Sequence, residues 1–219
     1  MRTTAFAMFG SILLAGSFSS GGIVRGQQAN PVQTHIGHVM DRFEAAPNQQ
    51  GLLPTALAEA KIATQHAGLA LKNPDNLDAI KQHAGHVMHA IDPSVETTGP
   101  GLGFGVKRAA AGVAQHVQLA AKGPGAGFTV MAHALHVAGA ANNVVKRADE
   151  IVGLAQKARA AATAGEASAL MTQANASIAQ LTAGFDANKN GEIAWDAPEG
   201  GLQQAQEHMM LLRKEAGTQ

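Results

Sequence analysis

Residues 77–91 read LDAIKQHAGHVMHAI, and this stretch decides the fold class. Apolar side chains recur in it at alternating spacings of three and four residues, the period of one helix face. The positions are Leu77, Ile80, Ala84, Val87 and Ile91. The stretch is therefore predicted to be an amphipathic helix with one face in a core.

Working outward, the same period recurs in segments that proline and glycine interrupt, while strand-like alternation of β-branched and aromatic residues is missing. Seven helices are predicted, near 31–45, 54–72, 75–91, 103–122, 126–160, 166–182 and 198–215. Most of the connections are short, which favours antiparallel neighbours. The fold class is thus expected to be all-α, an antiparallel helical bundle.

Two histidine motifs repeat along the predicted helices. His-x-x-His-Val begins at His35, His83 and His133, and Gln-His-x-x-Leu places a single histidine at His66 and His116. Both motifs recur after about fifty residues, which is typical of a repeated helical hairpin. Eight of the ten histidines belong to these motifs, whereas His89 and His208 do not.

Composition excludes several classes of protein. The 219 residues contain no cysteine, so disulfides, cysteine zinc sites, cysteine-held iron–sulfur clusters and c-type haem are excluded. Sixteen basic residues balance sixteen acidic ones, so the chain lacks the broad positive charge that grips nucleic acid, and no nucleic-acid partner is expected.

The paired histidines fit a metal site. Residues three apart on a helix lie about 5–6 Å from each other at Cβ, so both imidazoles can reach one ion. A single histidine from a facing helix would complete the site, and imidazole suits Cu, Zn and Ni. The predicted ligands are His35, His38, His66, His83, His86, His116, His133 and His136.

The function expected from these ligands is transition-metal buffering, storage or delivery. In style the chain is similar to small His-rich periplasmic metal-binding helical proteins. Two other interpretations stay open. The chain could be a non-catalytic helical scaffold or interaction protein whose only ligand is calcium, or the histidines could be axial ligands of a b-type haem in a redox bundle.

No enzyme is expected, because the His-Glu-x-x-His, Glu-x-x-His and Gly-x-Ser-x-Gly motifs are all missing. The glycine-rich run Gly99–Gly105 precedes a helix and is interpreted as a flexible connection. Its amides could receive an anion, but it lacks the lysine and hydroxyl of a phosphate loop.

Residues 186–197 resemble the calcium loop of the EF-hand family. Asp186, Asn188 and Asn190 occupy its first three oxygen-ligand positions, and Gly191 and Glu192 follow as in the family. The resemblance implies weak calcium binding, because Ala197 replaces the bidentate glutamate at position twelve. Asp196 and Glu199 are the carboxylates that could substitute, although Asp196 could instead cap the last helix.

The chain is expected to divide into three parts: a signal peptide over 1–26, a His-rich bundle over 27–182, and an EF-hand-like helix–loop–helix over 183–219. Arg2 and the short apolar run that follows it are typical of a secretory signal. We therefore expect a periplasmic or secreted protein without a permanent membrane span, and with no protein partner indicated.

Overall fold

A computed structural model describes residues 30–217, which form a bundle of seven α-helices and contain no β-strand. The signal-peptide prediction falls on residues outside this range. The helices are α1 (Pro31–Met40), α2 (Leu52–Lys72), α3 (Leu77–Ile91), α4 (Val106–Ala121), α5 (Phe128–Ala160), α6 (Ala164–Ala183) and α7 (Leu202–Gly217), with a short 3₁₀ turn η1 (Pro47–Gln49). The predicted all-α bundle is confirmed.

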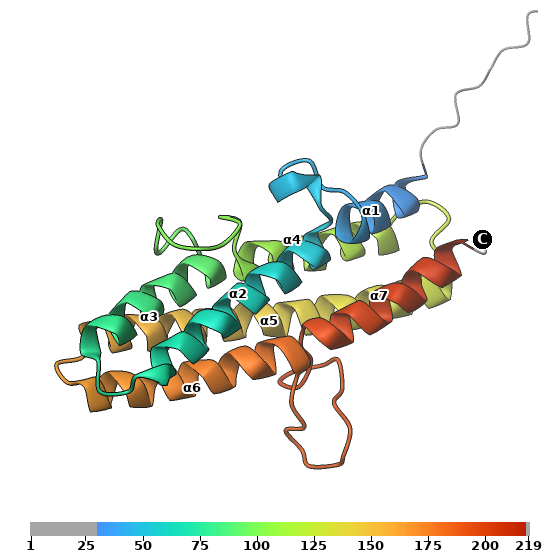
Figure 1. Cartoon of the computed structure of the whole chain (residues 1–219). Helices are drawn as coiled ribbons and strands as arrows, with labels where there is room; N and C mark the ends of the chain where they lie inside the picture. The colour runs from blue at the N-terminus through green and yellow to red at the C-terminus, as the bar shows by residue number, and fades with distance from the viewer. Residues whose placement is uncertain (1–29, 218–219) are drawn as a thin grey trace, which may run out of the picture.

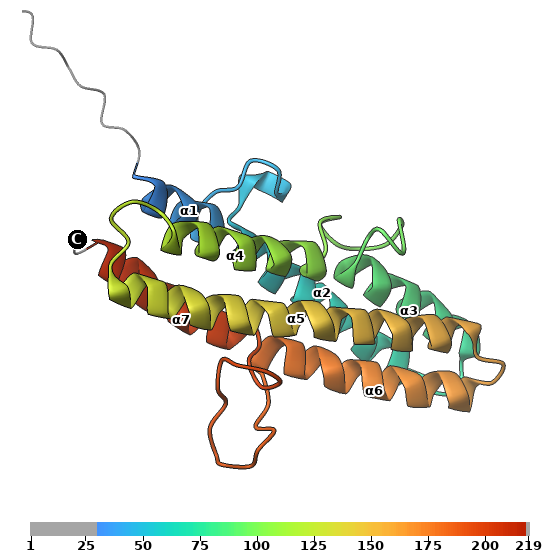
Figure 2. The same ribbon diagram turned by 180° about the vertical axis from the view of Figure 1, so that it is seen from behind.

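The long helix α5 is the central helix of the bundle and contacts four others. It packs against α3 and α4 on one side and against α6 and α7 on the other (Figure 2). The end of α7 lies close to α1, at the same end of the bundle (Figure 1). Much of the core is alanine, whose small side chain lets helices approach closely.

Two helix ends differ from their predicted positions. The first helix ends at Met40 and not near 45, because the chain turns back and Gly51 lies against the Met40 backbone, where a Cβ would be 2.5 Å from the carbonyl carbon. The last helix begins at Leu202 and not near 198. Asp196 does not cap it, since it lies six residues before the start of the helix, and its carbonyl accepts the Glu199 and Gly200 amides in a turn.

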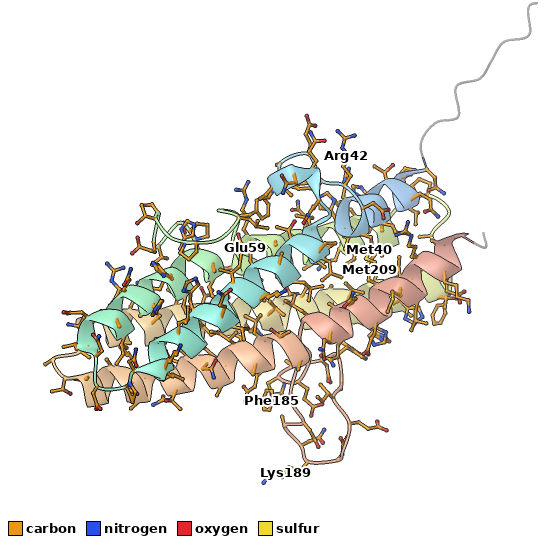
Figure 3. All side chains as sticks on the ribbon, in the orientation of Figure 1. Met40, Arg42, Glu59, Phe185, Lys189 and Met209 are labelled. Carbon is orange, nitrogen blue, oxygen red and sulfur yellow. The ribbon has the colours of Figure 1, made fainter. Side chains whose placement is uncertain are left out.

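The glycine-rich connection is anchored, which corrects its interpretation as flexible. The fully buried Glu59 carboxylate accepts backbone N–H groups of Leu102, Phe104 and Gly105 at 2.9–3.1 Å. Figure 3 shows Glu59 on α2 directed at this connection. The amides do receive an anion, but that anion is a side chain of the same protein.

Candidate metal centres

Three groups of three histidines lie within the bundle. The first triad is His35, His38 and His116; the second triad is His66, His83 and His86; the third triad is His133, His136 and His208. In each triad one nitrogen from each ring lies within 4.8 Å of the other two, and all nine side chains are half-buried. Residues 30–217 hold no other group of three histidine or carboxylate side chains this close.

Every triad is built in the same way, from a pair on one helix and a single histidine on a neighbour. The pair occupies positions three apart, so both rings leave the same helix face. Helices α1 and α4 form the first triad, α3 and α2 the second, and α5 and α7 the third. These helix pairs pack directly on each other (Figure 1).

The single histidine is the centre of each triad. Nδ1 of His116 lies 3.0 Å from Nδ1 of His35 and 3.3 Å from that of His38. The matching distances from His66 are 3.1 and 3.2 Å, and those from His208 are 3.3 and 3.4 Å. The same ring atom therefore faces inward in all nine residues.

This geometry suits a cation better than a hydrogen-bond network. A neutral imidazole nitrogen carries either one N–H or one lone pair, so each central Nδ1 can make one well-aligned hydrogen bond and not two. A metal ion takes the lone pairs of all three. Zn–N bonds of 2.0–2.1 Å in a tetrahedron place the nitrogens about 3.3 Å apart, which matches the spacing between the central nitrogen and each nitrogen of the pair.

Burial keeps the imidazoles in the neutral form that binds metals. Loss of solvation, the largest cause, and charge repulsion from His38 and His35 together lower the pKa of the central His116 to about 4. The same two causes lower the pKa of five other members, namely His35, His66, His86, His136 and His208. Protons therefore compete weakly for these sites near neutral pH.

All eight predicted histidine ligands lie in the triads, and the structure adds a ninth, His208. A sequence signal for it exists: His66, His116 and His208 are each followed by leucine three residues later and lysine six residues later. Glu207 stands before His208 where the repeated motif has glutamine, so His208 does not match that motif. His89 lies outside the triads and contacts the Glu96 carbonyl oxygen through Nδ1, at 2.8 Å.

The calcium-loop residues lie between α6 and α7 in a loop that projects from the bundle, with Lys189 near its tip (Figure 3). The Asp186 carboxylate accepts the Asn190 and Gly191 amides, and that of the buried Glu199 accepts the Asn188 and Ala194 amides. Glu192 and Asp196 are exposed. Calcium binding stays a prediction.

Searches of family models, curated proteins and solved structures gave no match to the chain. None of the helices within residues 30–217 combines the length and apolar character that a membrane crossing requires. The three histidine triads are therefore the features of the chain that indicate a function.

Proposed function

We propose that this protein binds transition-metal ions at its three histidine triads, as a periplasmic or secreted buffer, store or delivery protein and not as an enzyme. The observation that carries the proposal is that the central Nδ1 of each triad lies 3.0–3.4 Å from both Nδ1 atoms of the histidine pair. Three neutral nitrogen ligands suit Cu, Zn and Ni, and they leave a coordination position for water.

The test is a count of bound ions. Protein that lacks the predicted signal segment is loaded with Zn(II) or Cu(II), desalted and analysed for metal. Three ions per chain are expected, and His83→Ala with His86→Ala should lower the count to two. The matched control is His89→Gln, which changes the one histidine outside the triads and should still bind three. Retention of all three ions by the double variant would contradict the proposal.

The haem alternative is less well supported by this geometry. Two axial histidines lie on opposite faces of a porphyrin, whereas the central nitrogen of each triad lies within hydrogen-bond distance of both nitrogens of the pair. A Soret band in protein purified from its native compartment would restore that alternative.

Calcium binding by residues 186–199 is a separate proposal. Calcium would be either the only ion that the chain binds or an additional ion beside those at the triads. Glu199 supports it, because both of its carboxylate oxygens face loop amides although Ala197 leaves position twelve without a ligand. Calcium should raise the melting temperature of the parent protein, and Asp186→Ala should abolish that rise. An equal rise in both proteins would place the ion elsewhere.

A further inference from the structure

The three triads differ in what lies against their rings. The Phe43 ring centroid is 5.3 Å from that of His116, at the first triad. Trp195 stacks on His136 at the third triad, with centroids 4.3 Å apart and planes 17° apart. Among the described residues, neither phenylalanine nor tryptophan contacts the second triad. There, His86 borders an open pocket of about 350 Å³.

One face of α5 fixes Trp195 in place. Gly139 lies one turn after His136 and makes room for the indole, since a Cβ there would be 2.8 Å from Trp195 Cε3. Further along that face, Asn143 Nδ2 donates to the Asp196 carbonyl at 2.8 Å, and the buried Arg147 donates to the Pro198 carbonyl at 2.8 Å. The segment after Trp195 is therefore bound to the same helix that carries the histidine pair.

We propose that the triads exchange ions at different rates: Trp195 is a lid that makes the third triad retain its ion, and the second triad exchanges ions with solution. This inference rests on the proposed function. An ion leaves a three-imidazole site as the rings rotate away one at a time, and His136 cannot rotate without breaking its stack on Trp195. The usual free energy of an aromatic pair corresponds to a release of the ion that is slower by about 2- to 10-fold.

Access of solvent to the triads also favours faster ion exchange at the second triad than at the third. The pocket beside His86 is lined by polar and charged side chains of α3, of the connection after it and of α5: Lys81, Gln82, Glu96, Thr98 and Arg159. A soluble chelator can approach the second triad from this side. The indole instead covers one face of the His136 ring at the third triad, so a chelator can reach that face only after the lid moves.

Trp195 also supplies the measurement, because it is the only tryptophan in the chain. Its stack on His136 places the indole next to the third triad and no other. Cu(II) bound at that triad should quench its fluorescence, whereas Cu(II) at the other two should quench it much less. Fluorescence thus reports one site while the absorbance of a copper–chelator complex reports all three.

The experiment loads the full chain with three equivalents of Cu(II) and mixes it with excess chelator in a stopped-flow instrument. We expect a fast absorbance phase without fluorescence recovery, and recovery only in the slowest phase. His83→Ala with His86→Ala should remove the fast phase. Trp195→Ala, followed by absorbance, should accelerate the slowest phase about 2- to 10-fold and leave the fast phase unchanged. Trp195→Phe, which keeps a ring, should preserve the slow phase.

The control variant is Phe128→Ala, which removes an aromatic ring from α5 that is 83% exposed and is not among the rings in contact with the triads. Fluorescence recovery in the fastest phase would overturn the inference, and this result needs no Trp195 variant. An unchanged slow phase in a folded Trp195→Ala protein would overturn it as well. Failure of the chain to bind Cu(II) at the triads would instead refute the proposed function.

Discussion

The central imidazole of each triad lies close to two other imidazoles and is also kept neutral. It is close enough to its partners to share a cation with them, yet partial burial keeps it uncharged at neutral pH. Free histidine, with a pKa near 6.5, would be partly protonated in mildly acidic surroundings and would release metal there. The triads should hold ions under more acidic conditions than isolated histidines do.

The same pKa shift predicts how the stability of the metal-free protein depends on pH. His116 is neutral in the folded chain down to about pH 4, whereas it takes up a proton near pH 6.5 in the unfolded chain. Protonation therefore favours unfolding, so the contribution of His116 is fully present above pH 6.5 and is lost as the pH falls to about 4.

Urea unfolding measured over this interval checks the prediction. The free energy of unfolding should fall less steeply with decreasing pH in His116→Gln than in the parent protein, because glutamine does not titrate. Identical slopes would show that His116 is not the group responsible.

Residue patterns predicted eight ligands because a pair at i and i+3 reaches one face of any helix. They could not identify His208 as a ligand, because it follows His116 by much more than the fifty-residue period and is not preceded by glutamine. Trp195 was also beyond sequence reasoning, because a ring in an irregular loop can be assigned to a neighbour only after the loop is placed.

At the scale of elements, the connection before α4 depends on one side chain of α2. Three backbone amides of residues 102–105 share the Glu59 carboxylate. Gly101 allows this close approach, since its φ is +152° and a Cβ there would lie 2.9 Å from Glu59 Oε2. The connection is thus held to the bundle although it has no regular structure of its own.

Glu59→Gln should destabilise the protein by about 1–3 kcal/mol, because an amide offers one acceptor oxygen in place of two and leaves a buried N–H unsatisfied. Chemical denaturation measures the loss, and faster hydrogen exchange at Leu102, Phe104 and Gly105 would locate it. Glu44→Gln is the control, since Glu44 is exposed. Equal stability of the two variants would mean that the anchor contributes little.

Helix periods predicted all seven elements, and the largest errors lay at ends that tertiary contacts decide. No signal within the helix marks Met40 as the end of α1, because the turn there depends on Gly51, eleven residues further along the chain. Proline near 198 resembles a helix start, yet the segment from 195 to 198 is held by α5 and the helix begins after it.

At the scale of the whole molecule, the first two sequence repeats exchange partners. Each repeat carries a histidine pair followed by a single histidine: α1 then α2, α3 then α4, and α5 then α7. Only the third repeat forms a triad from its own residues. The pair of the first repeat meets the single histidine of the second, and the pair of the second meets that of the first.

Ion counts in paired variants test this exchange. His35→Ala with His116→Ala should cost one of the three ions, because both residues belong to the first triad. His35→Ala with His66→Ala should cost two, although these residues belong to the same sequence repeat. The reverse outcome would mean that each repeat folds on itself. Periodicity could not foresee the exchange, since it fixes helix faces and not the order of helices in a bundle.

Exchange of partners also sets the order in which the triads can form as the chain is made from its N-terminus. The second triad joins residues only 17 and 20 positions apart, so its ends meet at small entropic cost. The first triad spans 81 and 78 positions, and the pair made earliest must wait for His116. His208 completes the third triad last. An ion present during synthesis therefore meets a finished site first between α2 and α3.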